Sequence, residues 1–188
     1  ATWVNLCYIV FHELTGINVI MLYSTTIFKQ MKGGSFTPRL GTQIVGVIDL
    51  LACFLSIWTV KKFGRVTLVI WGHLLIAGAH FGVGFSAMND SNTGVLLFVL
   101  LFLVIYQNSS GPIAWLYAAE TTIDAALGIC IFTLWGTVFI LSIISPILMK
   151  DENLGEQGTF FLFAGLSILG SLYCKTILIE TKGLSDKD

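Results

Sequence analysis

Two carboxylates stand inside long apolar stretches of this sequence, where an ionised side chain is expensive. Glu13 follows His12 in the first apolar stretch, and Asp49 lies in the middle of the second. Acidic groups at membrane depth usually form a buried pair or line a polar pathway. Glu13 and Asp49 are therefore candidates for accepting hydrogen bonds from a polar ligand or for carrying a proton.

A run of polar side chains interrupts a later apolar stretch. Gln107 to Ser110 are consecutive polar residues, and Trp115 follows one turn further on. Amides and hydroxyls can bind the hydroxyls of a sugar, while a flat aromatic ring stacks on the C–H faces of the sugar ring. Polar packing between helices is an equally compatible interpretation of this run.

Glycine and proline break two of the apolar stretches. One break covers residues 14–18 with Gly16, and the other covers residues 109–115 with Gly111 and Pro112. Backbone groups freed by such breaks cannot be satisfied by lipid, so the breaks usually face other helices or a water-filled cavity. A kink that only aids packing is the alternative.

The elements that must position these residues are membrane helices. The chain is 55% hydrophobic and 11% charged, with a mean hydropathy of +0.86, whereas soluble domains carry roughly 25% charged residues. A bilayer core needs about 20 mostly apolar residues per helix. We predict an all-α membrane protein formed by one bundle of six spans, at Thr2–Phe28, Gly41–Val60, Val66–Met88, Gly94–Ala119, Leu127–Met149 and Thr159–Ile179.

The distribution of basic residues predicts the orientation of the bundle. Six spans bring both ends of the chain to one side, together with the connectors at residues 61–65 and 120–126. That side has Lys61, Lys62, Arg65, Lys175, Lys182 and Lys187, against Lys29, Lys32, Arg39 and Lys150 on the other. The positive-inside rule places the termini in the cytosol.

Several classes of function are not supported. The net charge is −1 and no basic run is present, which argues against nucleic-acid binding. The four cysteines form no CxxC pair, and no metal-ligand cluster, catalytic Ser/His/Asp order or phosphate-binding glycine loop lies outside the spans. We therefore expect neither an enzyme nor a metal site or cofactor.

Four motifs, in order along the chain, resemble those of sugar porters, a branch of the major facilitator superfamily. Residues 14–18 with 23–28 resemble the pattern of the seventh helix, and Gly64-Arg65 resembles the turn after the eighth. Residues 111–115 with Ala119-Glu120 resemble the tenth-helix motif, and residues 180–183 resemble the signature after helix twelve. The resemblance covers nearly the whole chain and implies helices seven to twelve, the C-terminal half of a transporter.

That resemblance implies roles for particular residues. The sugar would sit at mid-membrane between two six-helix halves that rock around it. Asn18 and Trp115 would contact the sugar, and Tyr23 would help to occlude it. A cytosolic gate would be formed by Arg65, Glu120 and Glu180.

The sequence departs from the family at sugar-contacting positions. His12 and Glu13 replace two glutamines, Asp49 replaces asparagine and Gln107 replaces glutamate, while Leu134 stands where glucose transporters have asparagine. The resulting substrate-binding prediction is His12, Glu13, Asn18, Tyr23, Asp49, Gln107, Gly111 and Trp115. Both uniport and proton symport fit these residues, and we prefer plain hydrogen-bond acceptance for Glu13 and Asp49.

Two functions remain open at this point. The first is transport of a hexose or similar small polyol by alternating access, with an N-terminal half as partner. The second is a half-transporter that does not transport and serves as a structural subunit of a membrane assembly. In either case we expect a multi-pass protein surrounded by lipid, in the plasma membrane or alternatively in an organelle membrane.

Overall fold

The computed structural model describes residues 2–30 and 38–183 of the 188-residue chain. These residues form helices and, within the described ranges, no strand. The helices are α1 Thr2–Glu13, α2 Ile17–Gln30, α3 Pro38–Lys62, α4 Arg65–Met88, α5 Asn92–Gln107, α6 Ser110–Thr121, α7 Asp124–Leu148 and α8 Gly155–Ile177. The all-α class predicted from the sequence is confirmed.

Six segments of the described chain are long and apolar enough to cross a membrane. They are Thr2–Ser24, Arg39–Lys62, Arg65–Met88, Asn92–Thr121, Asp124–Leu148 and Gly155–Ile177. The first combines α1 with most of α2, and the fourth combines α5 with α6. The expected connector Lys29–Leu40 lies mostly outside the described residues.

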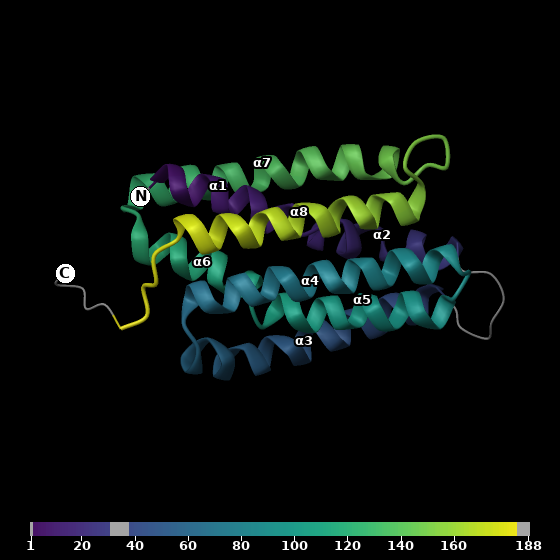
Figure 1. The fold of residues 1–188 in the computed structure, drawn as a ribbon, viewed down its shortest axis with the longest axis horizontal. Coiled ribbons are helices and arrows are strands. Elements are labelled where there is room, and N and C mark those ends of the chain that lie inside the picture. Colours follow the sequence, from purple (N-terminus) through teal and green to yellow (C-terminus); the bar gives the residue numbers. More distant parts are fainter. Residues whose placement is uncertain (1, 31–37, 184–188) are drawn as a thin grey trace.

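The helices run side by side in one bundle, with α4 between α5 and α8 (Figure 1). Its buried face includes the small residues Gly72, Ala77, Ala79 and Gly84. Small side chains allow helix backbones to approach closely, which is how membrane helices gain packing energy. On this face Ser171 of α8 donates a hydrogen bond to the Ile70 carbonyl at 3.0 Å.

Large hydrophobic side chains are exposed on the outer faces of the bundle. Phe54 on α3 is 65% exposed and Phe132 on α7 is 80% exposed. In lipid an apolar side chain gains little from burial inside protein, so large hydrophobic residues can stay outside. The buried positions hold polar side chains as well as hydrophobic ones, among them His12, Thr15 and His80.

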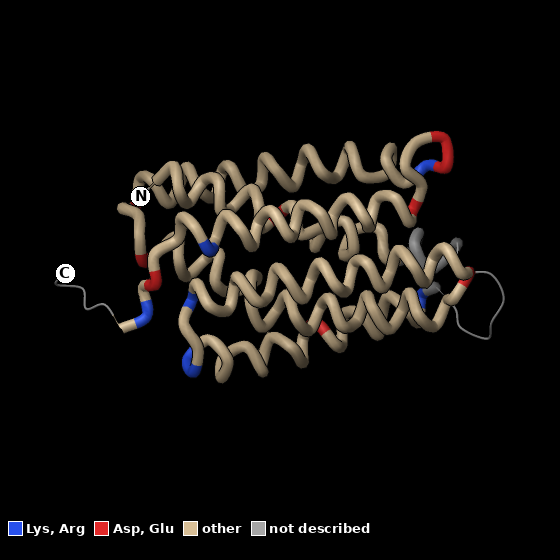
Figure 2. The backbone as a smooth tube through the Cα atoms, in the orientation of Figure 1, with Lys and Arg blue, Asp and Glu red and all other residues tan. Residues whose placement is uncertain are grey.

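Charged residues gather at the two ends of the bundle (Figure 2). The first residues of α1 and the last residues of α8 lie at the same end, next to the turn between α3 and α4 (Figure 1). Among the described spans, Glu13 and Asp49 are the acidic residues that lie away from the span ends. Their neighbours therefore decide what the interior of the bundle can do.

Candidate functional site

The first span breaks directly after Glu13. Gly16 has a φ of 82°, a left-handed conformation that glycine adopts at low cost, and its amide donates to the Glu13 carbonyl at 3.1 Å. The Thr15 hydroxyl donates to the His12 carbonyl at 2.6 Å. The Thr15 carbonyl accepts a hydrogen bond from Nε2 of His80 on α4 at 2.7 Å. Protein groups thus satisfy backbone atoms that lipid could not.

The second break separates α5 from α6. Pro112 lies in the first turn of α6, where a missing N–H removes no intrahelical hydrogen bond. Ser110 begins this helix, and its Oγ lies 3.0 Å from Nδ1 of His12. The two breaks therefore meet inside the bundle, although they lie 98 residues apart in the sequence.

A polar cluster surrounds this meeting point. Nε2 of His12 lies 3.1 Å from the Tyr106 hydroxyl and 3.5 Å from Oε1 of Glu13. The other carboxylate oxygen of Glu13 accepts a hydrogen bond from the Asn18 side-chain amide. We call His12, Glu13, Asn18, Tyr106 and Ser110 the His12 cluster. Asn18 is partly exposed, whereas the other four residues of the cluster are buried.

Asp49 and Gln107 form a second polar pair beside the cluster. Nε2 of Gln107 donates to Oδ1 of Asp49 at 2.7 Å, joining α5 to α3. Gly111 packs against this pair, since a Cβ added at Gly111 would lie 3.1 Å from Oε1 of Gln107. Because Tyr106 and Gln107 are consecutive, the pair adjoins the His12 cluster.

Two of the consecutive polar residues of the fourth span belong to the polar groups described above, and the other two make helix-packing contacts. Gln107 and Ser110 belong to the groups described above. Oδ1 of Asn108 accepts from the Thr59 hydroxyl at 3.2 Å, and its Nδ2 donates to the Val104 carbonyl at 2.8 Å. The Ser109 hydroxyl donates to the Ile105 carbonyl at 2.6 Å. Helix packing thus accounts for Asn108 and Ser109.

Two aromatic residues that the sequence assigned to the site have described contacts with residues other than these polar groups. The Tyr23 hydroxyl donates to the Ser142 carbonyl at 2.7 Å and connects α2 to α7. Trp115 is 46% exposed. With Leu134 it lines a small apolar hollow, whose other residues are Ile9, Ala114, Ala118, Leu127, Cys130 and Ile131. Leu134 thus contributes an apolar side chain to the wall of this hollow.

The three predicted gate residues come together at the end of the bundle where α4 begins. Nη2 of Arg65 lies 2.9 Å from Oε1 of Glu120. The Glu180 carboxylate accepts hydrogen bonds from the backbone amides of Arg65 at 2.7 Å and Val66 at 3.1 Å. The Thr181 hydroxyl donates to the second oxygen of Glu120 at 2.6 Å. These contacts connect α4, α6 and the segment after α8.

Sequence reasoning missed Tyr106 as a member of the polar interior and could not identify the partner of His80. Tyr106 immediately precedes the polar run, and that adjacency was a usable signal. His80 is a histidine at membrane depth, but nothing in its own span indicates that its partner is the Thr15 carbonyl. Both contacts depend on how two distant helices face each other.

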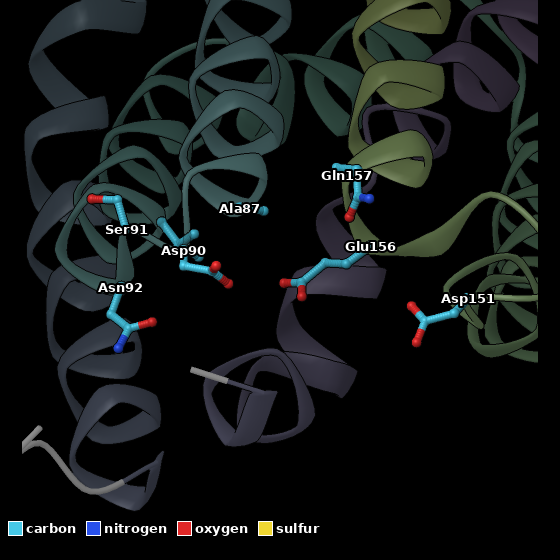
Figure 3. A pocket seen from close by; sticks show the side chains of 8 residues that line it. Ala87, Asp90, Ser91, Asn92, Asp151, Glu156 and Gln157 are labelled. Carbon is cyan, nitrogen blue, oxygen red and sulfur yellow. The ribbon is translucent and has the colours of Figure 1, made fainter. Parts of the chain in front are cut away.

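A pocket of about 150 Å³ lies where α4 ends and where α5 and α8 begin (Figure 3). Because α4 begins at Arg65, this is the opposite end of that helix from the gate residues. Asp90, from the turn before α5, and Glu156, at the start of α8, point into it from two sides. Among the described residues, no group of three or more His, Cys, Asp or Glu side chains is placed to hold a metal ion. We therefore keep this pocket separate from the candidate site.

Comparison with known proteins places the chain in a family. A family model described as "Sugar (and other) transporter" matches residues 2–187. The major myo-inositol transporter IolT of Bacillus subtilis is 32% identical over 182 residues, which cover 92% of this chain and 38% of that protein. The D-xylose-proton symporter of Escherichia coli is 30% identical over 184 residues, covering 93% of this chain and 37% of the symporter.

Solved structures show the same similarity. A crystal structure of a D-xylose-proton symporter matches with a TM-score of 0.87 at 26% identity, covering 98% of this chain and 44% of that one. The proton:xylose symporter XylE bound to 6-bromo-6-deoxy-D-glucose matches with a TM-score of 0.86 at 28% identity, covering 98% and 41%. The chain thus spans less than half the length of these relatives. It belongs to the sugar porter family of the major facilitator superfamily.

Proposed function

We propose that this chain is the C-terminal, six-helix half of a carrier that moves a hexose or a similar small polyol across a membrane by alternating access. The observation that carries the proposal is the meeting of the two helix breaks, where His12 of α1 contacts Ser110 of α6. Broken helices that meet inside a bundle place polar groups and irregular backbone at membrane depth, which is where transporters bind their substrates.

The chemistry of the neighbouring side chains suits a neutral polyhydroxylated molecule. Asp49 supplies carboxylate acceptors, and Gln107 and Asn18 supply amide groups that both donate and accept. The names of the relatives agree with this class of substrate, since they include a myo-inositol transporter and xylose symporters. The half-exposed indole of Trp115 offers a flat apolar face for a sugar ring.

The contacts at the end of the bundle support a conformational role in the same function. Arg65 and Glu120 lie in two different spans, and Glu180 lies in the segment that follows a third. Such a group holds one conformation only if its contacts differ between the two states of the carrier. We propose that this group is the cytosolic gate, with an N-terminal half completing the carrier in the plasma membrane.

Uptake of radiolabelled D-glucose, D-xylose and myo-inositol into proteoliposomes tests this function, with the purified protein at its native length. We expect saturable uptake of at least one of these compounds. Trp115→Ala should lower that uptake at least tenfold, while the matched control Trp135→Ala, at an exposed position on α7, should retain it. If folded protein transports none of the three, the carrier proposal is wrong and a structural subunit becomes the better explanation.

A further inference from the structure

We propose that His12 and Glu13 form a proton-binding site in this half of the carrier, and that one proton crosses the membrane with each sugar molecule. This inference rests on the proposed transport function and adds a second transported species to it. Some relatives are named as proton symporters, but those names identify no proton-binding residue. The assignment comes from the geometry of the His12 cluster.

The Glu13 carboxylate is enclosed, and no lysine or arginine of the described residues forms an ion pair with it. It is 2% exposed, and its nearest basic group is Nε2 of His12 at 3.5 Å. The ten lysine and arginine residues of the chain all lie in connectors, in the terminal tail or in the end turns of spans. Compensation of the carboxylate charge therefore depends on an added proton.

A bound proton cancels the net charge of the His12–Glu13 pair. With one proton the His12–Glu13 pair is neutral overall, whichever of the two groups carries it. Without the proton, the pair holds one negative charge inside the bilayer, which is costly in a medium of low polarity. The Ser110 and Tyr106 hydroxyls, at 3.0 and 3.1 Å from the two ring nitrogens, can donate or accept and so fit either arrangement.

The other helices packed around the pair provide no substitute for the proton. Tyr106 on α5 and His73 on α4 interact with the pair, and Asp49 on α3 adds a further negative charge near Tyr106. The charged residues of α6, α7 and α8 lie at helix ends: Glu120, Asp124, Glu156 and Lys175. Asp49 differs from Glu13 because its described partner is the amide of Gln107 and not a histidine.

Asn18 connects proton binding to sugar binding. Its amide donates to the Glu13 carboxylate, and under the proposed function this partly exposed side chain also binds a sugar hydroxyl. A hydrogen bond to an ionised acceptor is roughly twice as strong as one to a neutral acceptor. Protonation of the pair therefore releases the Asn18 amide for a sugar hydroxyl. By reciprocity, bound sugar strengthens proton binding by the same factor.

Symport follows from this linkage. The proton enters from the side at which the sugar enters and leaves with it on the other side, when the opened site again meets water. Because the sugar is neutral, each cycle moves one positive charge. The apparent KM for sugar should rise with pH, by up to about tenfold per unit above the range in which the pair is protonated.

The test uses the protein at its native length in proteoliposomes, with radiolabelled D-glucose, D-xylose and myo-inositol as probes and an imposed pH gradient that is acid outside. We expect accumulation above equilibrium together with sugar-dependent alkalinisation of the medium. In Glu13→Gln any uptake that remains should stop at equilibrium, with no proton movement and with a KM that does not vary with pH. The matched control Glu156→Gln, at the far end of the bundle, should accumulate sugar as the native protein does.

The outcomes separate this inference from the proposed function. If Glu13→Gln accumulates sugar in response to the gradient, the proton site lies elsewhere. If the native protein equilibrates sugar without moving protons, symport is wrong and transport stands. If folded native protein moves none of the probes, the transport function and the proton site both fail.

Discussion

Nε2 of His80 lies 2.7 Å from the carbonyl oxygen of Thr15, so a side chain of α4 holds the break between α1 and α2. The carbonyl belongs to the turn that ends α1, where the regular helical hydrogen bonds are interrupted. The imidazole is buried against the rings of Phe102, Phe160 and Phe163. His80 is therefore fixed on both sides and supports the turn that carries the His12 cluster.

Loss of the His80 side chain should destabilise the bundle. His80→Leu leaves the Thr15 carbonyl buried without that donor, at a cost of about 1–3 kcal/mol. His73→Leu is the matched control, since His73 bonds the Val69 carbonyl of its own helix. Thermal unfolding in detergent should show the larger decrease in Tm for His80→Leu, and His80→Phe, which keeps a ring, should resemble it. Equal decreases in Tm for His80→Leu and His73→Leu would show that the hydrogen bond from His80 to the Thr15 carbonyl does not stabilise the bundle.

The left-handed turn at Gly16 should not accept a side chain. Alanine there must adopt a φ near 82°, and its Cβ would meet the Phe163 ring at 3.2 Å. We expect Gly16→Ala to lower the free energy of unfolding by about 1–2 kcal/mol. Gly78→Ala is the control, because Gly78 is helical with no atom within 4 Å of an added Cβ. Alanine at Gly78 should be neutral or stabilising by up to about 1 kcal/mol. A similar loss of unfolding free energy in both variants would show that the left-handed conformation of Gly16 is not what disfavours alanine.

Glu180 caps α4 from the far end of the sequence. The residue before α4 is Gly64, which has no side chain to cap the helix, and the Glu180 carboxylate binds the first two amides instead. Glu180→Ala should cost about 0.5–2 kcal/mol, the usual value of an N-terminal cap. Hydrogen exchange at Arg65 and Val66 should become faster.

Glu120→Ala provides the comparison for that cap. It removes the partly exposed ion pair with Arg65, which is worth about 0.2–1 kcal/mol. The amides at the start of α4 should stay protected in this variant. Faster exchange in Glu120→Ala than in Glu180→Ala would show that the salt bridge, and not the cap, holds the start of α4.

Adjacent residues of the fourth span should differ in their effect on transport. Under the proposed function, Gln107→Ala removes a sugar partner and leaves Asp49 without its amide, so we expect KM for sugar to rise by about 5- to 150-fold. Asn108→Ala should leave KM unchanged and lower stability by about 1 kcal/mol, because Asn108 packs against Thr59. Initial uptake rates over a range of sugar concentrations give KM for each variant. An equal change in KM for Gln107→Ala and Asn108→Ala would contradict the different roles given to these two residues.

The sequence by itself determined the class of the fold and the two helix breaks. Apolar stretches of the length of a bilayer leave few alternatives to helices, because only a helix satisfies its own backbone in lipid. Gly16 and Pro112 then mark positions where a regular helix cannot continue unchanged. The same local reasoning identified Glu13 and Asp49 as interior carboxylates, since their cost depends on depth and not on particular partners.

Only the tertiary structure decided which polar groups meet. The helix α5 is apolar on nearly every side, so its pattern does not indicate which face turns inward. Gln107 and Asn108 are neighbours in the chain, yet one bonds Asp49 and the other bonds Thr59. The contacts of His12 with Ser110 and of His80 with Thr15 likewise depend on how whole helices rotate and pack. That rotation is set by close packing between many residues at once, which no single span encodes.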